Sequence, residues 1–133
     1  MRMMTGTPAI PCYYAALAGL DIVSEIGVPA IRKRSKAMTT RLLELVDHYG
    51  FTSNASRDPE RLAGTVVVNV PQAPLVSRTL KARDFLVDYR APVGIRISPH
   101  FYNTMDEIDR MMAEIAGIVA KKDYAGGVSS LVT

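Results

Sequence analysis

The chain has 133 residues, 48% of them hydrophobic and 22% charged, which is the balance of a folded domain and excludes wholesale disorder. Cys12 is the single cysteine, so an internal disulfide or a cysteine zinc site is excluded, and a reducing compartment is indicated. No apolar run approaches the ~20 residues that span a bilayer, and no signal-peptide core follows Met1. We therefore expect a cytoplasmic protein without membrane contacts.

The net charge of +3 comes from 16 Lys and Arg against 13 Asp and Glu. Much of the excess lies in one run, residues 32–36. Three consecutive residues on a helix spread over about 200° of its circumference and do not line one groove. The run is therefore interpreted as a solvated helix face, with an acidic partner as the alternative, and nucleic acid is not expected as a partner.

Two helices are predicted at the beginning of the chain. The first covers about 8–26 and ends at Gly27; the second covers 29–49 and ends at Gly50, a residue suited to a left-handed cap. Cys12, early in the first helix, is interpreted as a small core residue. The apolar residues of the first helix recur at helical spacing: Ile10, Tyr13, Tyr14, Leu17, Leu20 and Ile26.

The middle of the chain predicts a small sheet interrupted by a short helix. The surest strand is 65–70, which is rich in β-branched residues. Segments 85–89 and 94–98 are predicted to be hairpin partners, and 51–54 is a weaker strand candidate. The short helix is expected between 74 and 84.

The last helix has the clearest boundaries. Thr104 and Glu107 form a capping-box pattern at its start. We expect one domain over 1–127 and a tail over 128–133. The apolar stripe of this helix contains Ile108, Met111, Met112, Ile115, Ile118 and Val119.

This order of elements predicts an α+β fold. Short, partly hairpin-connected strands favour a small antiparallel sheet of three to four strands, with helices packed on one face. The other face is then left for water or for another domain.

Few residues have the pattern of a self-sufficient catalytic site. His48 is interpreted as a surface residue, and no serine or cysteine motif accompanies His100. Four carboxylates between 106 and 114 follow the spacing of a helix surface. The sequence contains no phosphate-binding glycine loop and no cluster of metal ligands.

Two places are more suggestive of anion binding. Gly6 and Thr7 come directly before a helix, where free N–H groups bind anions, although ordinary helix capping explains the same residues. Arg96 lies between two isoleucines of a predicted strand. If those isoleucines face the core, Arg96 projects from the other face and can hold a carboxylate with its planar fork. The alternative is a structural ion pair with Asp88 or Glu107.

Several segments together resemble the C-terminal part of kynureninase, and more loosely other class V aminotransferase-type enzymes such as cysteine desulfurases. The resemblance covers roughly residues 5–124. The pattern D-Y-R-x-P…R…P-x-x-Y-N-T is its most specific part. The segments that carry it are 6–10, 19–22, 31–35, 88–92 and 96–104.

The resemblance implies a pyridoxal 5'-phosphate enzyme of the aspartate-aminotransferase fold, working as a homodimer. In such enzymes a large domain holds the cofactor and the small C-terminal domain closes over a small amino-acid substrate. Arg96 matches the arginine that binds the substrate α-carboxylate. Gly6 and Thr7 match a segment that reaches the active site near substrate or, for Thr7, near the cofactor phosphate of the neighbouring subunit.

The chain lacks the part of that family that carries the cofactor lysine. Its five lysines all lie in ordinary helix-surface patterns. We therefore expect the small domain of a kynureninase-like hydrolase of tryptophan catabolism, which cleaves the Cβ–Cγ bond of kynurenine to anthranilate and alanine, inactive as this chain alone. The alternatives are the small domain of a class V aminotransferase or cysteine desulfurase-like lyase, and a stand-alone, non-enzymatic interaction module.

Overall fold

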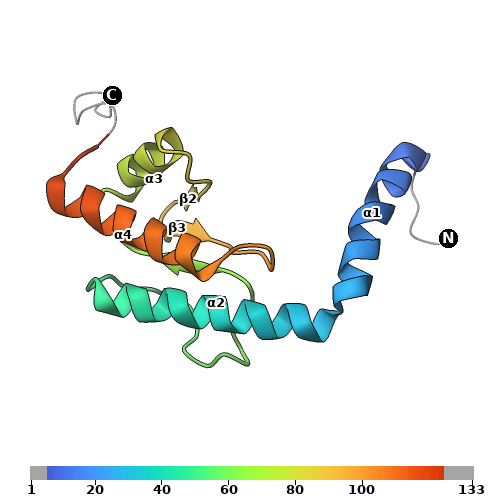
Figure 1. Cartoon of the computed structure of the whole chain (residues 1–133). Helices are drawn as coiled ribbons and strands as arrows, with labels where there is room; N and C mark the ends of the chain where they lie inside the picture. The colour runs from blue at the N-terminus through green and yellow to red at the C-terminus, as the bar shows by residue number, and fades with distance from the viewer. Residues whose placement is uncertain (1–5, 125–133) are drawn as a thin grey trace. The chain divides into compact units, whose positions relative to one another are not determined.

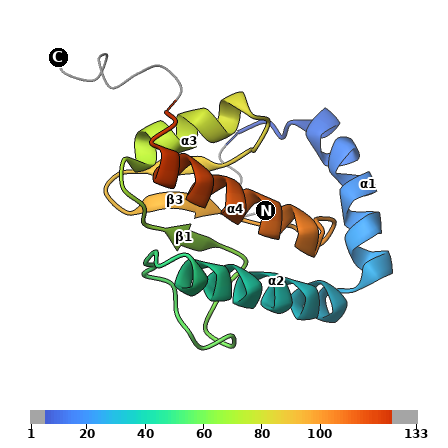
Figure 2. The same ribbon diagram turned by 60° about the vertical axis from the view of Figure 1, so that its left-hand side comes forward.

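The computed structural model describes residues 6–124, which fall into two compact units. The first unit runs to Lys33 and the second begins at Arg34. The predicted boundary after residue 127 and the tail lie outside the described residues. The described part of the chain contains seven elements (Figure 1 and Figure 2): α1 (Ile10–Ile26), α2 (Val28–His48), β1 (Val66–Val68), α3 (Ala73–Ala82), β2 (Asp88–Arg90), β3 (Gly94–Ile97) and α4 (Met105–Lys121).

The first unit contains α1 and the beginning of α2. The predicted first helix is confirmed, and the N–H of Gly27 closes it with a 2.9 Å hydrogen bond to the carbonyl of Val23. No residue of α1 is buried, so the interpretation of Cys12 as a core residue is wrong. The apolar spacing of this helix is real, but within the described residues no second layer covers it. Among the described helices, none is by itself long and apolar enough to cross a membrane, and only α1 and α2 taken together as a bent pair have the required length and composition.

The second unit is built on a three-stranded antiparallel sheet of order β1-β3-β2. The predicted hairpin is confirmed, although its first strand covers Asp88–Arg90 and not 85–89. The strands β2 and β3 pair across a short turn that contains a cis peptide bond before Pro92. The weaker strand candidate at 51–54 forms only an isolated bridge, between Thr52 and Asn69. The strand β3 is therefore central, with β1 and β2 at the edges.

One face of the sheet forms the core together with the helices of this unit. Figure 2 shows α4 in front of β3, and α2 and α4 run side by side in both views. The predicted stripe of α4 is buried except for Val119, which is partly exposed. The fully buried side chains of this layer include Met38, Leu42, Val46, Val66, Val68, Ile95, Met112 and Ile115. The predicted α+β fold with helices on one face of the sheet is thus confirmed.

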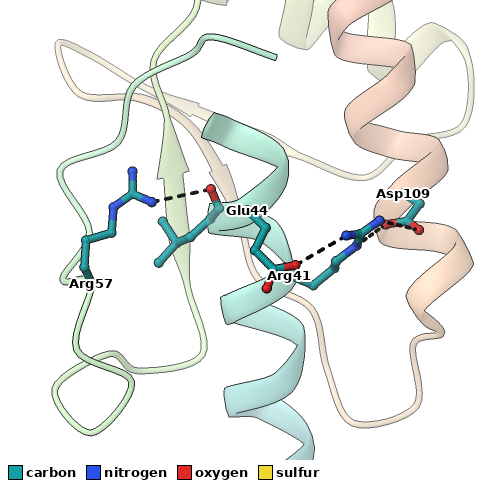
Figure 3. A network of polar contacts seen from close by, with 5 residues as sticks. Arg41, Glu44, Arg57 and Asp109 are labelled. Atoms are coloured by element: carbon teal, nitrogen blue, oxygen red, sulfur yellow. Dashed lines mark hydrogen bonds and ion pairs between the residues drawn. The ribbon is translucent and has the colours of Figure 1, made fainter. Parts of the chain in front are cut away.

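Charged side chains connect the helices and loops around this core. Arg41 of α2 donates two hydrogen bonds to Asp109 of α4, at 2.8 and 3.2 Å, and a third to Glu44 at 3.3 Å (Figure 3). Arg57, in the loop before β1, binds both carboxylate oxygens of Asp47 on α2, at 2.7 and 2.8 Å. These contacts fix α2, α4 and the loop relative to one another within the second unit.

Candidate functional site

The face of the sheet opposite the helices carries the candidate site. Along β3 the side chains alternate, so Ile95 and Ile97 are buried while Arg96 and Ser98 are exposed. Arg96 keeps 44% of its side chain exposed. The prediction that Arg96 projects from the face opposite its isoleucine neighbours is confirmed.

Arg96 contacts an acidic residue on the neighbouring strand. Asp88 is its cross-strand partner in the β2–β3 register, and the distance from Arg96 Nη2 to Asp88 Oδ2 is 2.7 Å. Arg90 Nε lies 2.7 Å from the same carboxylate oxygen. Of the two ion pairs considered as alternatives for Arg96, the pair with Asp88 is present. Glu107 instead belongs to the cap of α4.

These charges lie at the surface, where they add little to stability. The side chains of Asp88 and Arg90 are 38% and 59% exposed. Ion pairs in such positions contribute about 0.2–1 kcal/mol, because water and salt screen them. The backbone hydrogen bonds of the ladder already hold β2 to β3. An arginine in this place is thus accessible to a ligand carboxylate.

An open depression lies beside Arg96. Its volume is about 310 Å³, and its lining includes Leu86, Asp88, Arg96 and Ser98. Leu86 is 98% exposed and also lines an adjoining pocket with Ser98 and Asn103. A cation and an apolar side chain in one depression suit a ligand with a carboxylate and an apolar part. Leu86 and Arg90 were missed by sequence reasoning, although the two-residue period of a strand places 86, 88 and 90 on one face.

The loop that follows β3 is held by several contacts. Arg34 donates hydrogen bonds to the carbonyl oxygens of Phe101 and Asn103, at 2.7 and 2.6 Å. At the end of the loop the predicted capping box is confirmed: Thr104 and Glu107 each accept a hydrogen bond from the other's backbone N–H. The hydrogen bond from the Thr104 N–H, followed by that from the Asn103 side chain, lowers the pKa of Glu107. These contacts fix the second half of the loop.

The two histidines lie outside this depression. The ring of His100 packs against Phe101 and Tyr102, with centroids 4.4 and 4.5 Å away. His48 lies at the end of α2, exposed, with its ring 4.8 Å from that of Tyr49. Neither lines the depression beside Arg96, and their interpretation as residues without a catalytic role stays a prediction.

Gly6 and Thr7 belong to the first unit and are exposed. The N-cap residue of α1 is Ala9, and no side chain caps this helix, so the capping explanation for Thr7 is wrong. The anion contact proposed for Gly6 and Thr7 stays a prediction. Because Arg96 belongs to the other unit, the structure describes the two places separately.

The described residues do not fit pyridoxal phosphate by themselves. Lys36 is engaged with Glu60, and no lysine lines the depression beside Arg96. The remaining lysines are exposed, within helices or directly after one: Lys33, Lys81, Lys121 and Lys122. Between residues 6 and 124, no group of three or more His, Cys, Asp or Glu side chains is placed to hold a metal ion. What the site itself offers is carboxylate binding.

The chain is similar in sequence to known proteins over most of its length. The family model of the kynureninase C-terminal domain matches residues 31–115. A kynureninase of Shouchella clausii is 31% identical over 124 residues, and one of Bacillus anthracis is 28% identical; both alignments cover 90% of this chain and 29% of the relative. The chain thus spans less than a third of the length of these relatives.

Solved structures share the fold. The apo structure of a cysteine desulfurase from Thermococcus onnurineus NA1 matches with a TM-score of 0.80 at 22% identity, over 90% of this chain and 34% of that one. A NifS-like protein matches with a TM-score of 0.73 at 21% identity, over 88% of this chain and 35% of that one. At this identity the likeness concerns the fold alone.

Proposed function

Because the chain belongs to the kynureninase C-terminal domain family, we propose that it is the small, substrate-carboxylate-binding domain of a kynureninase-like hydrolase. The reaction is the hydrolytic cleavage of the Cβ–Cγ bond of kynurenine to anthranilate and alanine. The observation that carries the proposal is the exposed guanidinium of Arg96 beside an open depression with an apolar wall at Leu86.

Within that reaction the role of this chain is to bind and orient the substrate. The planar guanidinium of Arg96 forms two parallel hydrogen bonds with the α-carboxylate, which fixes both the position and the plane of the amino-acid end. Leu86 offers an apolar surface to the remainder of the substrate or to the domain that covers the site. The chemistry at Cβ and Cγ needs groups that the described residues do not supply.

The cofactor and the other half of the site belong to a second domain in this proposal. The curated relatives are more than three times as long as the aligned segment, which covers 29% of them, and this leaves room in them for a cofactor domain. Bound pyridoxal phosphate supplies the electron sink for the bond cleavage. Gly6 and Thr7 are proposed to reach the active site from the first unit, in a homodimer near the cofactor phosphate of the neighbouring subunit.

A class V aminotransferase or a cysteine desulfurase-like lyase is the alternative. Two of the structural neighbours are a cysteine desulfurase and a NifS-like protein, but at 21–22% identity they support the shared fold and not this activity. The sequence relatives favour kynureninase, at 27–31% identity. Arg96 has the same role whether the protein is a kynureninase-like hydrolase or the alternative enzyme, because the substrates of both are α-amino acids.

The substitution Arg96→Lys tests the proposal in a protein that combines this chain with a pyridoxal-phosphate domain. A lysine keeps the charge but makes a point contact in place of the fork. Losing one charge-assisted hydrogen bond costs about 1.5–3 kcal/mol, so KM for kynurenine should rise roughly ten- to a hundredfold, with an unchanged Tm.

Thr104→Ala is the matched control, because Thr104 caps α4 and lies outside the lining of the depression. It should lower the free energy of unfolding by ~1 kcal/mol and leave KM unchanged. If Arg96→Lys lowers Tm and leaves KM at the wild-type value with the cofactor fully bound, Arg96 is a structural ion-pair partner and the proposal fails.

A further inference from the structure

We propose that Asp88 is a positioning residue for Arg96, and that Arg90 balances the charge of Asp88 so that a ligand carboxylate is still attracted. This rests on the proposed function, since it assigns how the carboxylate arginine is held. The three residues form a cluster on the exposed face of the β2–β3 hairpin.

The strand register determines which side chain reaches Arg96. Asp88 lies directly opposite Arg96 in the antiparallel ladder, so both side chains leave the sheet on the same face. The distance of 2.7 Å between Arg96 Nη2 and Asp88 Oδ2 is that of a charge-assisted hydrogen bond. Asp88 thus restrains a long side chain that an exposed surface would otherwise leave free to change rotamer.

The contact with Asp88 leaves the binding geometry of Arg96 usable. A guanidinium has five N–H donors, and the two hydrogens on Nη2 point into two different forks. One of them is used by Asp88 Oδ2, so the other fork keeps both of its donors for a ligand. Asp88 therefore orients the guanidinium plane while one bidentate face stays available to a carboxylate.

A carboxylate beside Arg96 has a cost that Arg90 offsets. Asp88 alone would cancel the charge of Arg96 and repel an incoming anion. Arg90 Nε lies 2.7 Å from the same oxygen, Oδ2, that Arg96 contacts. Two guanidinium groups and one carboxylate leave the cluster with a net charge of one positive unit, located beside the depression that Leu86 and Ser98 line.

The tests use the 133-residue chain itself, labelled with 15N, and two measurements. The order parameter of the Arg96 Nε–H bond reports how firmly the side chain is held. The ratio of the dissociation constants for chloride and acetate, at matched ionic strength, reports whether the site prefers a planar carboxylate over a spherical anion. Neither measurement needs a cofactor.

Asp88→Asn should lower the Arg96 order parameter from a restrained value above about 0.8 to a mobile one below about 0.6. It should also lower the dissociation constants of both acetate and chloride, because a negative charge is lost. The preference for acetate over chloride should fall at least threefold. Asp21→Asn is the control for charge: Asp21 is exposed on α1, in the other unit, and its replacement should change neither measurement.

Two further variants separate orientation from charge. Asp88→Glu keeps the charge but displaces the carboxylate by one methylene. The preference for acetate over chloride should therefore fall, while the affinity for anions in general does not rise. Arg90→Gln should raise the dissociation constants of acetate and chloride alike by several fold and leave the preference for acetate over chloride unchanged. Melting curves of each variant confirm that the compared chains are folded.

The proposal is overturned if Arg96 is equally ordered in wild type, Asp88→Asn and Asp88→Glu. It is also overturned if Arg90→Gln changes only the preference and not the affinity. A different result contradicts the proposed function alone: Arg96 loses order in Asp88→Asn, but the wild-type chain binds acetate no better than chloride. The two failures are therefore distinguishable.

Discussion

At the scale of single residues, Gly94 shows how closely the backbone is packed beside the candidate site. Its φ of +122° lies in a region that L side chains rarely adopt. A Cβ atom here would lie 2.6 Å from both Asn69 Oδ1 and the carbonyl oxygen of Val68. Glycine is therefore required where the hairpin turn meets β1, two residues before Arg96.

Gly94→Ala should lower the free energy of unfolding by more than ~1 kcal/mol, because the substitution adds both a strained φ and a close contact with backbone. Denaturant unfolding of the chain measures this. Gly117→Ala is the matched control: Gly117 lies within α4, and a Cβ atom added there would have no neighbour within 4 Å, so alanine should stabilise the chain by about 0.5–1 kcal/mol. Equal effects at the two positions would contradict the argument.

At the scale of elements, α4 is held by two carboxylates whose pKa values are lowered. The Thr104 N–H and the Asn103 side chain lower the pKa of Glu107, and the hydrogen bonds from Arg41 lower the pKa of Asp109 (Figure 3). Both groups are thus more acidic in the folded chain than in the unfolded chain. They contribute stability above their ordinary pKa values of 4.5 and 3.8, and this contribution is lost as the pH falls through the lowered values.

The double variant Glu107→Gln, Asp109→Asn should therefore unfold with a Tm that changes less between pH 5 and pH 3 than that of the wild type. The effect should be modest, because both side chains are open to solvent and their interactions are screened. Glu25→Gln, an exposed carboxylate of α1, serves as control and should leave the pH dependence unchanged. A double variant with the full wild-type slope would show that these carboxylates do not couple stability to pH.

The elements that the sequence predicts correctly are those with local signals. The capping box at Thr104, the hairpin around residues 90–94 and the stripe of α4 all depend on neighbours within four or five positions. The core position predicted for Cys12 is wrong, because periodicity describes a helix and not what covers it.

The candidate site was predictable only in part. Alternation along the strand placed Arg96 on the exposed face, and Asp88 was considered as its partner. The shared contact with Arg90 and the wall at Leu86 depend on the register between β2 and β3. Register needs the turn geometry, which residue types alone do not define.

At the scale of the whole molecule, the exposed apolar side chains of α1 have the largest consequence. They include Ile10, Tyr13, Tyr14, Leu17, Leu20, Ile22 and Ile26. Apolar side chains exposed in such numbers on one helix are normally covered in the functional protein. We expect the chain alone to self-associate, and a separately supplied cofactor domain to restore a defined stoichiometry.

Sedimentation velocity over a wide concentration range measures this association. Leu17→Glu with Leu20→Glu should shift the chain towards monomer, whereas Arg32→Glu with Lys33→Glu changes charge without removing apolar surface and should not. A wild-type chain that sediments as a clean monomer, and that does not bind a dye for apolar surfaces, would contradict the expectation.

The chain alone should also fail to attach pyridoxal phosphate at a defined lysine. Its lysines are exposed or engaged in an ion pair, without a cradle for the cofactor. After incubation with the cofactor and reduction with borohydride, mass spectrometry should find at most scattered labelling among the five lysines. Stoichiometric modification of one of them would show that this chain holds the cofactor itself.

The position of β2 at the edge of the sheet affects how the protein resists aggregation. An edge strand presents unpaired backbone groups, onto which a strand of another molecule can add. Two of the three residues of β2 are charged, and Asp88 and Arg90 project from the same face. A strand docking there would have to bury these charges or separate them. We therefore expect Asp88, assigned to positioning Arg96, and Arg90, assigned to balancing the charge of Asp88, to oppose fibril growth as well, and a variant that neutralises both should expose this edge to cross-β assembly.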